Sequence, residues 1–182
     1  MIKIGMVGVS PGNGHPYSFS SIINGYDPDG LARSGWDVIY NYVRERDRSD
    51  VGFDDAAVTH VWTQDSDETK RLQAACKIPH TVDAVGEFVS AGVDAVIIAR
   101  DDPETHASMA MPLLEAGLSV FVDKPLTLDA REIDGFRPYL ERGKLMSCSG
   151  LRYARELDGP RSNLDRYGTL RLIRGAVING WD

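Results

Sequence analysis

The chain has 182 residues, a formal net charge of −7 and 42% hydrophobic residues. This composition is typical of one globular domain, or one domain plus a fragment, and it excludes collagen-like and disordered chains. The acidic balance argues against nucleic-acid or anionic-membrane partners, and the longest purely apolar run, 95–99, is far too short to span a bilayer. Cys76 and Cys148 form no CxxC pair and no secretory leader is recognisable, so a cytoplasmic location is expected.

Apolar runs alternate with helix-like stretches along most of the chain. The first run, residues 2–9, is rich in β-branched residues and predicts a buried strand that ends in a glycine-rich loop. The elements expected after it are, in order, helices 17–24 and 31–46, strand 57–63, helices 65–77 and 82–91, strand 94–99, helix 103–116, strand 118–122, helix 129–142 and strand 145–149. Strands that alternate with helices predict an α/β fold, a doubly wound parallel sheet of the Rossmann type.

Residues 151–182 have a different character. A short helix is expected at 151–157, a polar loop at 159–167 and a strand at 169–177. A single strand must pair with another strand or remain an exposed edge. The sequence therefore predicts a first domain over 1–150 and, over 151–182, the start of a truncated α+β second domain. Two alternatives stay open: the strand joins the edge of the first sheet, or it pairs with a second copy in a homo-oligomer.

The loop after the first strand contains three glycines, Gly8, Gly12 and Gly14, just before a helix start. Backbone N–H groups without side chains at such a position suit the pyrophosphate of a dinucleotide. The spacing departs from the usual G-x-G-x-x-G pattern, because Tyr17 stands where the third glycine is expected. An ordinary glycine-rich turn is the alternative interpretation.

The strand 57–63 ends in Thr63, Gln64 and Asp65. A dinucleotide site usually has an acidic residue at this point to hold the ribose hydroxyls. Thr63 and Gln64 are able to hydrogen-bond a ribose, whereas Asp65 comes one or two residues late. The alternative for Asp65 is a helix N-cap.

Lys124 directly follows the strand 118–122, and Pro125 favours an extended backbone for it. Its ammonium is expected to project from the carboxyl end of the sheet, where it could hydrogen-bond a substrate hydroxyl and take part in proton transfer. A solvated surface lysine is the alternative. His106 is expected to be solvated or to cap the helix 103–116. The four histidines have no metal-ligand spacing, so no metal is expected.

Together these residues resemble the Gfo/Idh/MocA family of nicotinamide-dependent sugar oxidoreductases. The similar stretches are Asp-Ala-Val-Ile-Ile-Ala at 94–99, Pro-Glu-Thr-His at 103–106 and Val-Phe-Val-Asp-Lys-Pro at 120–125. The last is similar to the family's Glu-Lys-Pro motif, with Asp123 in place of glutamate. Residues 148–153 and 168–175 are similar to the start of the family's second domain.

The resemblance implies NAD or NADP as cofactor, a sugar, polyol or cyclitol as small-molecule substrate, and Lys124 as a catalytic residue. It also implies these cofactor contacts: Gly8, Ser10, Gly12, Gly14, Thr63, Gln64, Asp65, Ala99, Arg100, Asp123 and Arg152. The family's second catalytic residue is a histidine in the second domain, and no such histidine precedes Asp182. Three functions therefore stay open: an active oxidoreductase, a dinucleotide-binding module without catalysis, and an interaction protein that pairs through the strand 169–177.

Overall fold

The computed structural model describes residues 1–169, 171, 172 and 174. Two compact units are present, one of residues 1–148 and one that begins at Ser149. The first unit contains a six-stranded parallel sheet in the order β3-β2-β1-β4-β5-β6. Its strands are β1 (Ile2–Val7), β2 (Ala56–Trp62), β3 (His80–Thr81), β4 (Ala95–Ile98), β5 (Ser119–Val122) and β6 (Leu145–Met146). The predicted doubly wound α/β fold is confirmed.

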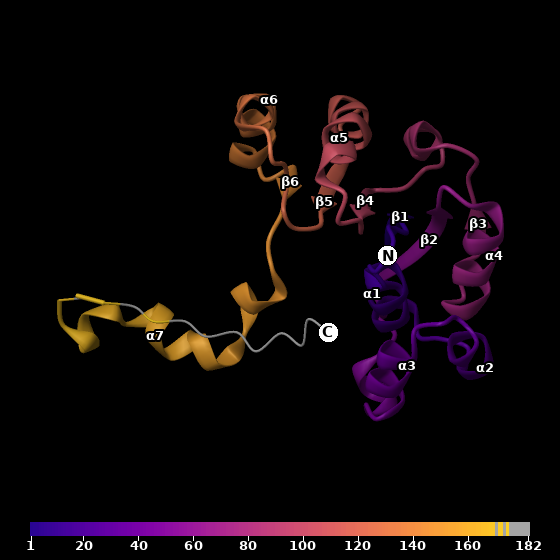
Figure 1. Ribbon diagram of the computed structural model, residues 1–182, viewed down its shortest axis with the longest axis horizontal. Helices are drawn as coiled ribbons and strands as arrows, with labels where there is room; N and C mark the ends of the chain where they lie inside the picture. The colour runs from indigo at the N-terminus through magenta and orange to yellow at the C-terminus, as the bar shows by residue number, and fades with distance from the viewer. Residues whose placement is uncertain (170, 173, 175–182) are drawn as a thin grey trace. The chain divides into compact units, whose positions relative to one another are not determined.

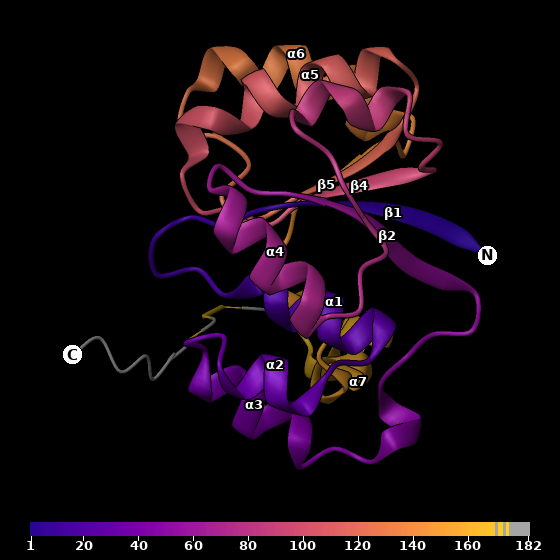
Figure 2. The same cartoon turned by 90° about the vertical axis from the view of Figure 1, so that its right-hand side faces the viewer.

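Helices cover both faces of this sheet, and the chain can be followed through them in Figure 1. Figure 2 shows α5 and α6 above the sheet and α1 and α4 below it, with α2 and α3 in an outer layer. The helices are α1 (His15–Asn24), α2 (Pro28–Ala32), α3 (Asp37–Arg44), α4 (Ser66–Ala75), α5 (His106–Glu115) and α6 (Ala130–Glu141). The strand order reverses between β1 and β4, which is where ligands bind in open α/β sheets.

The hydrophobic core has two parts, one on each face of the sheet. Successive residues of β1 serve both parts, because Met6 packs with the α1 side and Val7 with the α5 side, and both are fully buried. Gly5 makes room for an aromatic ring in the second part, since a Cβ there would lie 2.5 Å from the ring of Phe88. Close packing of this kind fixes the position at which β1 leaves the sheet.

The helix expected at 31–46 is two helices. Asp27 caps α2 by accepting a hydrogen bond from Gly30 N, and Pro28 occupies the first turn. The helix α2 ends at Ala32, and the turn that follows it contains Gly35, which has φ +84°, before α3 begins at Asp37. A left-handed residue ends a helix, and glycine adopts that conformation at little cost. The single-helix prediction was wrong for this reason.

Two further expectations need correction. The helix predicted at 82–91 is only a 3₁₀ helix at Val85–Val89, which buries Phe88 against the sheet. The loop predicted at 159–167 contains a short helix, α7 (Asp158–Ser162), and a 3₁₀ helix at Leu164–Tyr167. Proline is compatible with a first helical turn, so Pro160 does not prevent α7.

The strand expected at 169–177 lies largely outside the described residues. Those of its positions that are described, 169, 171, 172 and 174, belong to no helix or strand. In the part of the chain that the structure describes, no helix has the length and apolar character needed to cross a membrane.

Candidate functional site

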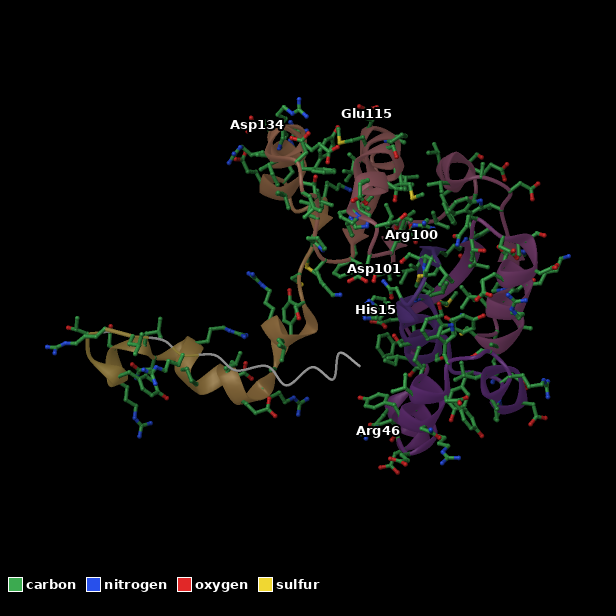
Figure 3. All side chains as sticks on the ribbon, viewed as in Figure 1. His15, Arg46, Arg100, Asp101, Glu115 and Asp134 are labelled. Atoms are coloured by element: carbon green, nitrogen blue, oxygen red, sulfur yellow. The ribbon has the colours of Figure 1, made fainter. Side chains whose placement is uncertain are left out.

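Four loops meet at the carboxyl edge of the sheet. They follow β1, β2, β4 and β5, and they hold most of the residues that the sequence singles out. Figure 3 shows three labelled side chains at this edge, His15 from the start of α1 and Arg100 and Asp101 from the end of β4. The parallel sheet thus brings together residues that are far apart in the sequence.

The three glycines after β1 have different physical roles. A Cβ on Gly8 would lie 2.2 Å from Pro16 Cγ, so this glycine allows α1 to begin close to the strand. A Cβ on Gly14 would lie 2.6 Å from Trp36 Cε3, so this glycine accommodates the outer helical layer. Gly12 has φ +81° and nothing within 4 Å of an added Cβ. Gly12 is therefore the one of the three that keeps the loop open to a ligand.

A hollow of about 370 Å³ lies beside this loop. Gly12, Trp36, Gln64 and Asp65 are among its lining residues. The volume falls within the range of about 300–1,000 Å³ that small-molecule sites occupy. An open glycine turn next to a hollow at the end of β2 fits the phosphates and nucleoside of a dinucleotide.

The turn after β2 uses part of its polar groups internally. The buried Thr63 hydroxyl donates to Asp65 O (2.6 Å) and lies 2.9 Å from Thr69 Oγ1. Asp65 caps α4, and the hydrogen bonds that it accepts from Glu68 N and Asp67 N lower the pKa of its carboxyl. Gln64 and Asp65 line the hollow, whereas the Thr63 hydroxyl is directed into the turn.

The Arg100 side chain makes hydrogen bonds to residues of three loops, those that follow β1, β2 and β4. Its Nε and Nη2 donate to the two carboxylate oxygens of Asp102 (2.8 and 2.6 Å), and its Nη1 donates to Val9 O (3.1 Å) and Gln64 Oε1 (2.7 Å). Burial alone would raise the pKa of Asp102, but the Arg100 guanidinium holds it below its ordinary value. The sequence places Arg100 beside the cofactor, and in the structure its donors serve the scaffold of the site.

We expect Arg100→Met to lower the free energy of unfolding by about 2 kcal/mol, because Val9 O and the Asp102 carboxylate lose their buried donors. Urea unfolding followed by circular dichroism measures this. The matched control is Arg131→Met, which removes the surface ion pair with Asp129 and is expected to change nothing measurable. An equal loss in both variants would contradict the structural role of Arg100.

Ser10 and Ala99 lie at the ends of neighbouring strands. The buried Ser10 hydroxyl bonds the Asp101 carboxylate and accepts a hydrogen bond from Asp101 N (3.0 Å). Ala99 is fully buried, and its N–H donates to Val7 O (2.8 Å). Both residues hold the ends of β1 and β4 in register beside the open glycine turn.

Asp123 joins the end of β5 to the glycine loop. Only 2% of it is exposed, and its Oδ2 pairs with His15 Nδ1 and accepts a hydrogen bond from Asn13 Nδ2 (3.1 Å). Its Oδ1 accepts from Lys124 N (2.9 Å). Burial alone would raise the pKa of Asp123, but the bonds from His15 and Asn13 hold it below its ordinary value. The stabilisation is therefore present above a pH of about 4 and is lost as the pH falls through the lowered value.

Lys124 is exposed at this edge, and its ammonium has no hydrogen-bond or ion-pair partner among the described residues. The chain just after it is fixed by His106, which is fully buried. His106 Nδ1 lies 3.0 Å from Pro125 O and 3.1 Å from Leu126 O, and its Nε2 lies 3.1 Å from Arg100 O. The expectation of a solvated or capping His106 was wrong, because the ring bridges the loops after β4 and β5.

For two residues, His15 and Arg152, the structure shows contacts that the sequence did not indicate. His15 was not selected from the sequence, because its partner Asp123 is 108 positions away and the pairing has no local signal. Arg152 belongs to the second unit, in a 3₁₀ helix at Gly150–Tyr153, and its carbonyl accepts a hydrogen bond from Arg161. Within the described residues, no cluster of three or more histidine, cysteine or acidic side chains could hold a metal ion.

The chain has relatives among known proteins. Residues 30–146 match the model of an oxidoreductase family with an NAD-binding Rossmann fold. Myo-inositol 2-dehydrogenase from Lactobacillus plantarum is similar in structure, with a TM-score of 0.62 at 16% identity. So is scyllo-inositol dehydrogenase from Lactobacillus casei, solved with NAD(H) and scyllo-inositol, with a TM-score of 0.62 at 18% identity.

Each alignment covers 91% of this chain but 41% of the solved one, so the chain spans about two fifths of the length of these enzymes. At such identities the likeness shows the fold. A comparison with curated proteins finds no match.

Proposed function

The chain belongs to the Gfo/Idh/MocA oxidoreductase family with its NAD-binding Rossmann domain, and from this premise we propose that it exchanges hydride between a nicotinamide dinucleotide and a carbon of a sugar, polyol or cyclitol. The observation that carries the proposal is the unpartnered Lys124 at the carboxyl edge of the sheet. Asp123 fixes the backbone of Lys124 to the loop that contains the open Gly12. Through Asp123, the glycine loop and the backbone of Lys124 are thus held in a fixed position relative to each other.

In this proposal, different residues of the chain bind the cofactor and the substrate. The loop around Gly12 binds the phosphates, and Gln64 and Asp65 contact the nucleoside in the hollow. The bound nicotinamide supplies the hydride acceptor or donor. The Lys124 ammonium donates a hydrogen bond to the substrate oxygen and stabilises the negative charge that develops on it. Lys124 therefore both orients the substrate and lowers the barrier.

The substrate class is supported by the neighbours, which are named as inositol dehydrogenases. We propose that the unit beginning at Ser149 is part of the substrate-binding domain. None of its described side chains is buried, so those residues form no core of their own. Both cysteines are free, which supports a reducing compartment such as the cytoplasm.

We expect the chain to bind NADH at least about tenfold more tightly than NADPH. A 2′-phosphate needs an uncommitted cation, and Arg71, the cation that lines the hollow, is paired with Glu68. Glu68 is held in turn by the Tyr17 hydroxyl (2.8 Å), and Asp65 adds negative charge to the same wall. Titration of the chain with each dinucleotide, followed by fluorescence, measures the two dissociation constants. Tighter binding of NADPH would contradict this assignment.

We expect Gly12→Ala to weaken NADH binding about tenfold or more, because its Cβ enters the space in which the phosphates approach the backbone. Gly117→Ala is the matched control. Gly117 also has a positive φ, +91°, and open surroundings, but it precedes β5 at the opposite edge of the sheet. Both variants carry the same backbone strain, so equal NADH affinities in the two would show that the loop is only a turn.

Hydride transfer itself is tested with NAD⁺ and a panel that includes myo-inositol and scyllo-inositol, by absorbance at 340 nm. Turnover supports the oxidoreductase. Saturable NADH binding without turnover of any sugar or polyol would favour a dinucleotide-binding module that does not catalyse.

A further inference from the structure

The carboxyl edge of the sheet holds a second group able to move a proton. We propose that His15 and Asp123 form a catalytic dyad, in which His15 Nε2 accepts the proton of the substrate hydroxyl while Lys124 holds its oxygen. This inference rests on the proposed function. It assigns a proton acceptor to this chain's own glycine loop.

His15 and Asp123 form a directed pair of side chains. His15 Nδ1 meets Oδ2 of the buried Asp123, and Asn13 and Lys124 donate to the same carboxylate. A carboxylate at Nδ1 selects the imidazole tautomer that leaves the lone pair on Nε2, as it does in hydrolase triads. In the described residues, His15 Nε2 has no hydrogen-bond partner, and 38% of the side chain is exposed. The Asp123 carboxylate of the pair is thus buried, whereas the His15 side chain is partly exposed.

The neighbouring side chains also fix the orientation of the His15 ring. Phe19 stacks on the His15 ring with centroids 5.2 Å apart and an angle of 21° between the planes. Phe19 is held in turn by edge contact with Phe121 of β5, at 6.2 Å between centroids. The Asn13 side-chain oxygen accepts a hydrogen bond from His15 N (2.8 Å). A surface histidine without function needs none of these supports, whereas a proton acceptor does.

The proposed reaction also requires a group that accepts a proton. Oxidation of an alcohol breaks the O–H and C–H bonds. The hydride leaves with its electron pair for the nicotinamide, the C=O bond forms, and one proton must be taken up. An ammonium group has donors and no lone pair, so Lys124 in its charged form orients the oxygen but accepts no proton. An imidazole ordinarily changes charge between pH 5 and 8 and is suited to that step.

The position of His15 supports the same division of roles. In a doubly wound fold the two halves of a dinucleotide lie over the two halves of the sheet. The hollow at the end of β2 belongs to the β1-β2-β3 half, whereas Asp123 and Lys124 end β5 in the other half. His15 reaches from the start of α1 to that second half, beside the expected nicotinamide end.

The test uses the charge of the nicotinamide ring, which is positive in NAD⁺ and neutral in NADH. An imidazole ordinarily changes charge between pH 5 and 8, and a positive charge beside the ring disfavours NAD⁺ more than NADH. The dyad therefore predicts that the dissociation constant of NAD⁺, divided by that of NADH, falls about tenfold between pH 5.5 and 8. The loop after β5 contributes the charged residues Asp123 and Lys124 to this edge, and the loop after β4 contributes Asp101 and the ion pair of Arg100 with Asp102. The ring of His106 is buried between these two loops. A His15 variant is therefore needed to show that the pH dependence of the ratio comes from His15.

His15→Asn keeps a donor for Asp123 and removes the imidazole ring, so the ratio for this variant should be independent of pH. His15→Gln serves if the first variant does not fold. The control His80→Asn alters an exposed histidine of β3 and should keep the wild-type pH dependence. With any polyol that the wild-type oxidises, His15→Asn should also lower kcat by about 10²-fold or more and remove the acidic limb of the kcat/KM profile.

The outcomes separate the two proposals. Saturable binding with a wild-type ratio that does not change with pH, or with the same change in His15→Asn, overturns the dyad and leaves the proposed function standing. Failure of both dinucleotides to bind overturns the proposed function and the dyad with it.

Discussion

Lys124→Ala is expected to lower turnover of a polyol by about a thousandfold or more, while the dissociation constant for NADH stays within a few fold of wild type. The Lys124 side chain is exposed and unpartnered among the described residues, so its removal breaks no contact of the cofactor loop. The backbone bond from Lys124 N to Asp123 is kept by alanine. Absorbance at 340 nm gives the rate, and NADH fluorescence gives the affinity.

Lys144→Ala is the matched control for this experiment. Lys144 is also exposed, but it precedes β6 at the opposite edge of the sheet, where its Nζ donates to Gly117 O (3.1 Å). Turnover by this variant should equal that of wild type. If Lys124→Ala keeps wild-type turnover, Lys124 has no part in the mechanism.

Gly8→Ala is expected to lower the free energy of unfolding by about 3 kcal/mol, because the added Cβ would lie 2.2 Å from Pro16 Cγ and 2.9 Å from Pro16 Cβ. A proline ring is closed onto its own backbone, so it can shift only slightly away from the added Cβ. The overlap is therefore relieved by moving the start of α1, and dinucleotide binding should weaken as well. Urea denaturation measures the loss of stability, and the NADH titration measures the loss of affinity.

The control for this change is Gly135→Ala. Gly135 is exposed in the interior of α6 and has nothing within 4 Å of an added Cβ. Alanine there is expected to stabilise the protein by about 0.5–1 kcal/mol through its higher helix propensity. A Gly8→Ala variant as stable as wild type would mean that Pro16 does not constrain the loop.

Local patterns were sufficient to predict the frame of the fold. The β-branched runs around β1, β2, β4 and β5 mark strands within a few residues of their observed bounds, because buried parallel strands need continuous apolar sequence. The break at Gly35 also has a local signal, a glycine inside a helical pattern, which the prediction of one helix over 31–46 did not use. The short β3 has no such signal, since its two residues are exposed.

The sequence predicts where the candidate site lies in the fold better than it predicts the contacts between the residues of that site. Strand ends indicate where Gly12 and Lys124 lie, because the carboxyl ends of parallel strands share one edge. The pairings of Asp123 with His15, and of Gly14 with Trp36, depend on tertiary packing and leave no trace in local sequence. The same is true of Arg100, whose four hydrogen bonds reach three separate loops.

The hydrogen bonds around Asp123 show how this chain accommodates an aspartate where the family pattern has glutamate. The family's glutamate in the Glu-Lys-Pro motif is an aspartate here, and the carboxylate of that aspartate is met by Asn13 and His15. With Asp123 alone changed, two donors of the loop would lose their acceptor; with the loop alone changed, a buried carboxylate would stand without them. Each half provides hydrogen-bond partners for the other, so the aspartate and the Asn-Gly-His loop are best transplanted or redesigned as a single unit.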